Sequence, residues 1–187
     1  MFLTRNEIKK AQQNGDVTIR PFVEKHISPN SIDVTLNNTL LVYDFSNTGC
    51  LDMKKDNATQ SIVIPEEGYV LEPGILYIGM TNETATSHKY IPMFEGRSSI
   101  GRLGINTHIT AGFGDVGWGF EMKDGELICH YPTWTLEINV VHPVRVYPDV
   151  RIGQVYFVEP KGDVEFYSGK YSSQHTPQPS RSYIDFK

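Results

Sequence analysis

The stretch TWTLEINVVHPVRVYPDVRIGQVYFV, residues 133–158, decides the class of fold. It contains three runs rich in β-branched and aromatic residues, 133–141, 144–147 and 151–158, and prolines stand between them. In the first run polar and apolar side chains alternate, which is typical of a strand with one buried and one solvated face. Consecutive short strands of this kind indicate an all-β sandwich or barrel.

Earlier segments have the same texture. Runs bounded by Pro, Gly or Asn occupy residues 17–19, 31–36 and 75–80. Between residues 96 and 104 the pattern changes, because Ile100 and Leu103 are three apart, and this spacing predicts a short internal helix.

A second helix is expected at the N-terminus. Thr4 and Glu7 form a capping-box pattern, and Ile8 and Ala11 supply an apolar stripe that ends at Asn14-Gly15. We therefore expect an all-β fold with one short N-terminal helix and one short internal helix.

The composition limits the classes of function. With 187 residues and 39% hydrophobic content, the chain suits a single domain, residues 1–187. A net charge of -5 gives no general attraction to nucleic acid or to an anionic membrane, so any phosphate site must be local. The chain has two cysteines far apart, which make neither a disulfide framework nor a metal motif. No apolar run reaches membrane-spanning length, and we expect a soluble cytoplasmic protein.

Residues 95–104, EGRSSIGRLG, concentrate two arginines, two serines and three glycines at the expected helix start. Hydroxyl, backbone N–H and guanidinium groups there make a competent phosphate cradle, while a solvated turn with a serine cap explains the same residues. No Gly-Lys-Ser/Thr follows, so the segment is not a Walker loop. The chemistry alone leaves cradle and turn open.

Other candidates are ambiguous when taken singly. On pattern alone Glu137 is an ordinary strand residue, and Asp115 belongs to an Asp-Val-Gly turn. His108 is interpreted as a hydrogen-bonded structural histidine. The neighbours Cys129 and His130 lack the further ligands that a metal site requires.

Taken together, several segments resemble, in order, the dCTP deaminase branch of the dUTPase superfamily. They are residues 3–8, 29–33, 71–74, 95–104, 107–115, 136–137, 169–174 and 179–183. The resemblance implies a distorted β-barrel or jelly-roll of the dUTPase-like type. It also implies a homotrimer with active sites between subunits.

The resemblance assigns roles to particular residues. Glu137 is implied as general base and acid, with Ser98 and Arg102 positioning it, the water and the base. Asp115 is implied to contact the deoxyribose 3′-hydroxyl beside Trp118. The implied substrate-binding residues are Arg97, Ser99, Ala111, Asp115, Thr135, Tyr167, Lys170 and Gln174. No residue is assigned to a metal.

The implied activity is zinc-independent hydrolysis of dCTP to dUTP and ammonia. The zinc deaminases carry a Pro-Cys-x-x-Cys signature that this sequence lacks. Mg²⁺ is expected to enter on the substrate triphosphate. Three alternatives stay open: a bifunctional enzyme that forms dUMP and pyrophosphate, a dUTPase, and a catalytically silent nucleotide sensor.

Two regions depart from simple expectations. More residues separate Asp115 from Glu137 than the family normally has, and residues 121–126 predict an inserted hairpin with an Asp-Gly turn. The alignment across residues 118–132 is therefore unsafe, and the insertion's Glu121 and Glu126 remain outside candidates for the carboxylate role. Residues 167–187 have the composition of a mobile tail, whereas the resemblance makes them a C-terminal lid that orders over the nucleotide.

Overall fold

The computed structural model describes residues 1–46, 49–172 and 174–187, so Ser173 of the tail motif lies outside the described residues. The helical elements are α1 (Arg5–Asn14), η1 (Glu24–His26), α2 (Ser98–Gly101) and η2 (Ser182–Phe186). The strands are β1 (Val17–Arg20), β2 (Ile32–Thr35), β3 (Thr39–Tyr43), β4 (Thr59–Val63), β5 (Tyr69–Leu71), β6 (Tyr77–Met80), β7 (Thr84–Ser87), β8 (Ile91–Gly96), β9 (Ile105–His108), β10 (Phe120–Lys123), β11 (Glu126–Cys129), β12 (Thr135–Val140), β13 (Val144–Val146) and β14 (Arg151–Val158).

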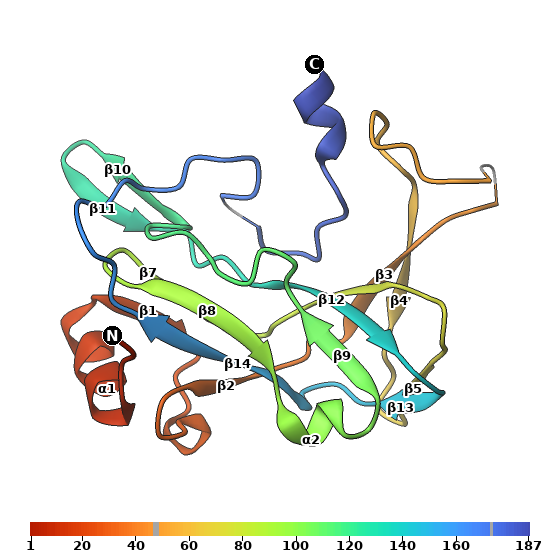
Figure 1. Cartoon of the computed structure of the whole chain (residues 1–187), viewed down its shortest axis with the longest axis horizontal. Coiled ribbons are helices and arrows are strands. Elements are labelled where there is room, and N and C mark those ends of the chain that lie inside the picture. The colour runs from red at the N-terminus through yellow and green to blue at the C-terminus, as the bar shows by residue number, and fades with distance from the viewer. Residues whose placement is uncertain (47–48, 173) are drawn as a thin grey trace.

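Two antiparallel sheets form the body of the molecule (Figure 1). One has the strand order β4-β3-β6-β12-β9 and the other β2-β14-β8, while β1–β7, β5–β13 and β10–β11 form separate pairs. Among the described residues these ladders do not join into one closed barrel. The expected all-β fold with two short α-helices is confirmed.

The alternation predicted for β12 is present. Leu136, Ile138 and Val140 are buried in the core, and the side chains between them lie on the more exposed face. Burying each such aliphatic side chain contributes about 1.5–3 kcal/mol, which fixes the face that the strand turns inward. Glu137 therefore lies on the face directed away from the core.

Both predicted helices are present, with two corrections. In α1, Ile8 and Ala11 are buried and Gly15 ends the helix at a φ of 81°. Thr4 is the N-cap residue, but its side chain makes no capping hydrogen bond, so the capping-box bond was wrong. In α2, Ile100 is buried as expected, but Leu103 lies beyond the end of the helix and is 53% exposed.

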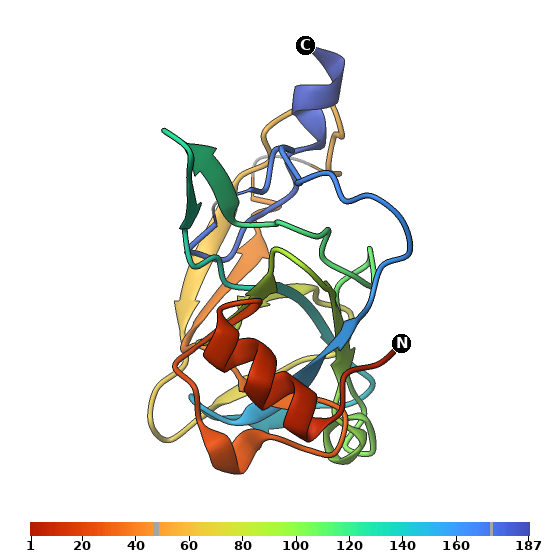
Figure 2. The ribbon, with the colours of Figure 1, turned by 90° about the vertical axis from the view of Figure 1, so that its left-hand side faces the viewer.

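The inserted hairpin is confirmed as β10–β11. Its turn places Asp124 at φ 53° and Gly125 at φ 84°, the pair of positive angles that an Asp-Gly hairpin turn requires. The hairpin stands apart from the two larger sheets (Figure 2). Over residues 1–46, 49–172 and 174–187, no helix has the length and apolar character needed to cross a membrane.

Candidate active site

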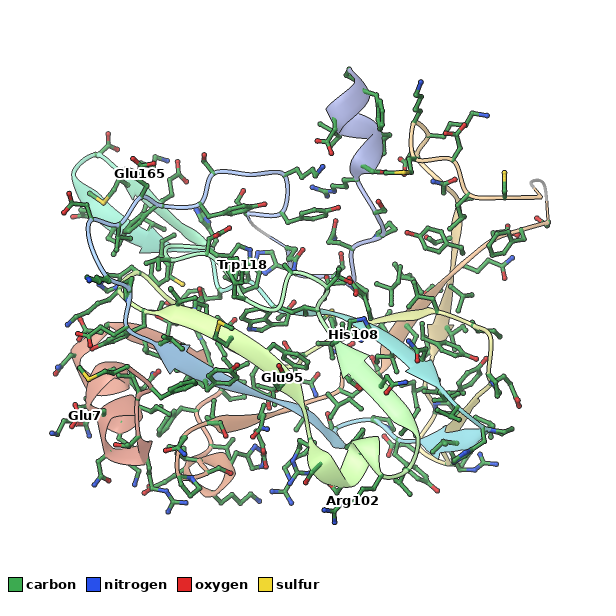
Figure 3. The ribbon with its side chains drawn as sticks, in the orientation of Figure 1. Glu7, Glu95, Arg102, His108, Trp118 and Glu165 are labelled. Carbon is green, nitrogen blue, oxygen red and sulfur yellow. The ribbon has the colours of Figure 1, made fainter. Side chains whose placement is uncertain are left out.

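A cavity of about 630 Å³ lies beside the outer face of β12, under the C-terminal tail. Its walls come from regions distant in sequence, which include β3, β6, the loop after β9, β12 and residues 167–180. Of the predicted site residues, the cavity is lined by Ala111, Asp115, Thr135, Glu137, Tyr167 and Gln174. Figure 3 shows Trp118 above β12 and His108 at the end of β9.

Glu137 is held by two partners from the neighbouring strand and loop. It lies directly opposite His108 in the β12–β9 register. The Thr110 hydroxyl donates a hydrogen bond to Glu137 Oε2, and His108 Nε2 lies 3.2 Å from the same oxygen. His108 was interpreted as a hydrogen-bonded structural histidine; in the structure its side chain is 47% exposed and its polar contact is with the candidate carboxylate.

Sequence reasoning missed Thr110. Its position two residues after His108 was a usable signal, because residues two apart in an extended chain lie on the same face. Tyr43 was also missed: it lines the cavity from β3, and its hydroxyl accepts a hydrogen bond from the Ser180 N–H. No local pattern marks Tyr43, since its contact depends on the path of the tail.

Aromatic side chains also line the cavity. Trp118 and Trp134 have ring centroids 4.9 Å apart, and both rings are largely buried. Gly114 passes so close that a Cβ there would lie 2.8 Å from Trp134, so only glycine fits this approach. Asp115 also lines the cavity, and the Trp118 N–H donates to its backbone carbonyl over 3.1 Å. The cavity thus combines the Glu137 and Asp115 carboxylates with aromatic side chains, a lining suited to a ligand with an apolar ring and a few polar groups.

The tail covers this cavity in an ordered way. The Thr133 N–H donates to the Gln174 carbonyl over 3.0 Å, and Gln174 Nε2 donates to the Thr133 carbonyl over 3.1 Å. The Gln178 N–H donates to Thr135 Oγ1 over 3.2 Å. The described tail residues are therefore docked on the body in this structure.

Lys170 does not line the cavity. Its ammonium donates a hydrogen bond to the Asp185 carboxylate in η2, and this bond raises the pKa of Lys170 above its ordinary value. Arg181 Nη1 donates to the Lys170 carbonyl over 2.7 Å. The side chain of the predicted lid lysine is thus already paired with Asp185 of η2.

The predicted Arg-Ser-Ser cradle is separated from Glu137. All four of its residues, like Lys170, lie outside the cavity lining: Arg97, Ser98, Ser99 and Arg102. They flank or form α2, which precedes β9, whereas Glu137 pairs with the last residue of β9. The strand alone spans about 10 Å, and Figure 3 shows Arg102 at the far edge of the molecule. Among the described residues, no lysine or arginine side chain lines the cavity.

The other carboxylate candidates are remote from the cavity. Glu121 and Glu126 lie on the exposed hairpin, and Glu121 Oε2 is 3.0 Å from His130 Nε2. Burial raises the pKa of the Cys129 thiol, so it is a poor thiolate ligand. The described part of the chain has no group of three or more His, Cys, Asp or Glu side chains arranged to hold a metal ion.

Comparison with solved structures defines the fold class. The chain is similar to the crystal structure of 2'-deoxycytidine 5'-triphosphate deaminase from Agrobacterium tumefaciens, with a TM-score of 0.56 and 18% identity. The similarity covers 83% of this chain and 47% of the solved chain, so this chain spans about half the length of that protein. The β-rich architecture around the cavity is therefore a dUTPase-like fold.

Sequence comparison then identifies the family. Residues 2–159 match the family model described as dCTP deaminase-like, and the chain belongs to that family. A Clostridium acetobutylicum protein named "dCTP deaminase, dUMP-forming" is 50% identical over 188 residues, which is 100% of this chain and 99% of the relative. A Cytophaga hutchinsonii protein of the same name is 48% identical over 188 residues, with the same coverage.

Proposed function

We propose that this protein hydrolyses dCTP to dUMP, with release of ammonia and pyrophosphate. Relatives named for forming dUMP match the chain over its whole length, and they support the bifunctional alternative over the dUTP-releasing enzyme expected first. The overall reaction consumes two waters: one replaces the 4-amino group, and one cleaves the bond between the α- and β-phosphates. We expect the protein to act in the cytoplasmic nucleotide pool.

The observation that carries the proposal is the Glu137 carboxylate, held at one wall of an aromatic cavity. Thr110 and His108 both engage Oε2. Within the described residues Oε1 makes no hydrogen bond to protein, and it is the oxygen available to a water. A carboxylate fixed in this way has the geometry of a general base.

In the proposed first step Glu137 takes a proton from water as the water oxygen forms a bond to C4 of cytosine. The π pair of the C4–N3 bond moves to N3, which receives this proton from the carboxylic acid, and the carboxylate then carries the proton of the new C4 hydroxyl to the 4-amino nitrogen. The C4–N4 bond breaks, its electron pair stays on nitrogen, and ammonia leaves. This route needs no zinc hydroxide, and the sequence has no Pro-Cys-x-x-Cys signature to hold one.

In the second step a water attacks the α-phosphorus, and the bond to the bridging oxygen breaks as pyrophosphate leaves. Mg²⁺ bound to the triphosphate's own oxygens would offset the negative charge that develops there. Lys170, Gln174 and Tyr167 are proposed to close over the phosphates when the tail rearranges.

The remaining contacts are proposed from the family resemblance and the cavity lining. The Ala111 carbonyl and the main chain at Thr135 face the base edge and distinguish a 4-amino donor from an acceptor. Asp115 accepts the 3′-hydroxyl of deoxyribose, which packs beside Trp118. A ribose 2′-hydroxyl would find little room against that ring.

We also propose a homotrimer in which neighbouring subunits complete each site. A triphosphate needs cationic partners, yet the described cavity lining contains none. The cradle formed by Arg97, Ser98, Ser99 and Arg102 lies at the opposite end of β9, and all of its residues except the half-buried Arg97 are exposed. In a ring, the cradle of one copy can reach the cavity of the next.

The test is a product analysis. Chelator-treated protein is incubated with dCTP and Mg²⁺, nucleotides are separated by anion exchange, and ammonia and pyrophosphate are assayed. Equal amounts of dUMP, ammonia and pyrophosphate are expected. Accumulation of dUTP with ammonia would instead establish the monofunctional deaminase, and unchanged dCTP would reject both proposals.

A further inference from the structure

We propose that Arg151 is a second phosphate-binding guanidinium and that buried Asp33 positions it beside Arg97. This inference rests on the proposed function, because it adds a residue to the triphosphate end of the same site. Arg151 lies outside every motif that suggested the family, so only the tertiary structure brings it to the cradle.

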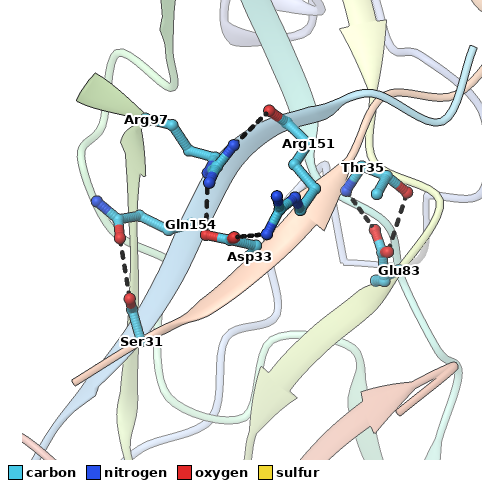
Figure 4. Close-up of polar contacts among 7 residues, drawn as sticks. All are labelled: Ser31, Asp33, Thr35, Glu83, Arg97, Arg151 and Gln154. Atoms are coloured by element: carbon cyan, nitrogen blue, oxygen red, sulfur yellow. Dashed lines mark hydrogen bonds and ion pairs between the residues drawn. The ribbon is translucent and has the colours of Figure 1, made fainter. Parts of the chain in front are cut away.

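The cluster centres on the Asp33 carboxylate (Figure 4). Arg97 Nε lies 3.1 Å from Asp33 Oδ1, and Arg151 Nη1 lies 3.1 Å from Asp33 Oδ2. Arg97 Nη1 also donates to the Arg151 carbonyl over 3.5 Å. Each carboxylate oxygen thus holds one guanidinium, and the two arginines cannot turn independently.

The three residues come from three adjacent strands. Asp33 is in β2, Arg151 begins β14, and Arg97 follows the end of β8. The β14–β2 register is irregular between Arg151 and Gly153. Such bulges redirect a side chain, and they are over-represented beside functional sites.

Burial and charge distinguish this cluster from a simple structural ion pair. The Asp33 side chain is 6% exposed, whereas those of Arg97 and Arg151 are 25% and 46% exposed. One carboxylate neutralises only one of two guanidiniums, so a positive charge remains at the surface. Within the described residues, the Nη2 groups of both arginines make no hydrogen bond to protein. Paired guanidinium forks directed outward are suited to phosphate oxygens.

The experiment compares Arg151→Gln and Arg151→Lys with wild type in the intact protein. Steady-state kinetics with dCTP separate KM from kcat, and calorimetry measures the Kd of inorganic tripolyphosphate. Loss of a charged hydrogen-bonding partner should raise both KM and Kd by about 10- to 100-fold, with little change in kcat. Arg151→Lys should recover part of the loss, because it restores the charge without the fork.

Arg145→Gln is the matched control. Arg145 is an exposed arginine of β13 that donates to the Gly68 carbonyl over 3.2 Å and belongs to no proposed site. It should leave KM and the tripolyphosphate Kd at wild-type values. If Asp33→Asn folds, it should show the same increase in KM. If it does not fold, the comparison of Arg151→Gln with Arg151→Lys tests the proposal.

The outcomes separate this inference from the proposed function. Wild-type turnover with unchanged KM and Kd in Arg151→Gln overturns the inference and leaves the function standing. Tripolyphosphate binding that depends on Arg151, in a protein that leaves dCTP unchanged, supports the anion site and rejects the function. Equal losses in Arg151→Gln and Arg145→Gln would also overturn the inference, because the effect would be one of general charge.

Discussion

His108 Nε2 lies 3.2 Å from Oε2 of Glu137, directly across the β9–β12 register, and the Thr110 hydroxyl bonds the same oxygen. The Thr110 hydroxyl and the His108 imidazole both restrain this oxygen, and among the described residues the other oxygen of the carboxylate makes no hydrogen bond to protein. A strand residue that looks ordinary in sequence thereby acquires the orientation that a general base requires.

Glu137→Gln should abolish ammonia release from dCTP while nucleotide binding changes by less than about threefold. The amide keeps the shape of the side chain but cannot accept a proton at neutral pH. Ammonia assay and calorimetry with dCTP measure the two effects. Turnover at the wild-type rate would remove Glu137 from the mechanism.

Asp185→Asn should lower the KM for dCTP by about two- to fivefold without changing kcat, because a solvent-screened ion pair is weak. In the structure the Lys170 ammonium is paired with the Asp185 carboxylate. The triphosphate must displace Asp185 before it can bind this ammonium. Asp163→Asn, at another exposed acidic residue near the tail, removes the same charge. Equal decreases in KM for both variants would show a general charge effect and not release of Lys170.

Glu83→Gln should change how stability depends on pH. Burial raises the pKa of Glu83 above its ordinary value of 4.5, although the Thr35 N–H and hydroxyl both donate to its carboxylate. Between 4.5 and the raised pKa the folded state binds more protons than the unfolded state, so this group's contribution to stability falls as pH rises through that window.

The glutamine variant lacks this titration. When the pH is lowered from about 7 to about 5, the melting temperature of the variant should therefore increase by less than that of wild type. Thermal unfolding at a series of pH values provides the measurement. Parallel curves for the two proteins would mean that Glu83 does not titrate differently in the folded state.

Gly153→Ala should destabilise the fold by about 1–3 kcal/mol through overpacking. A Cβ at this position would lie 2.2 Å from Phe94 Cζ in the core. Urea unfolding measures the change in free energy. Gly101→Ala is the control, since a Cβ there meets nothing within 4 Å, and a similar loss in that variant would contradict the packing explanation.

Much of the fold was predictable because it depends on local chemistry. The alternation in β12, the Asp124-Gly125 turn and the helix end at Gly15 follow from side-chain periodicity and backbone sterics within a few residues. Local patterns failed in two details at helix ends. Thr4 makes no side-chain cap, and Leu103 lies past the end of α2.

The sequence by itself determined the class of fold, the family resemblance and six of the residues that line the candidate cavity. Only the tertiary structure decided which residues meet. The contact of Glu137 with Thr110 and the joining of Arg97 to Arg151 through Asp33 depend on strand register, and core packing sets that register over long separations in sequence. The tertiary structure also decides the separation between the arginine cradle and the cavity. The cradle lies at α2, before β9 begins, whereas Glu137 pairs with the last residue of β9.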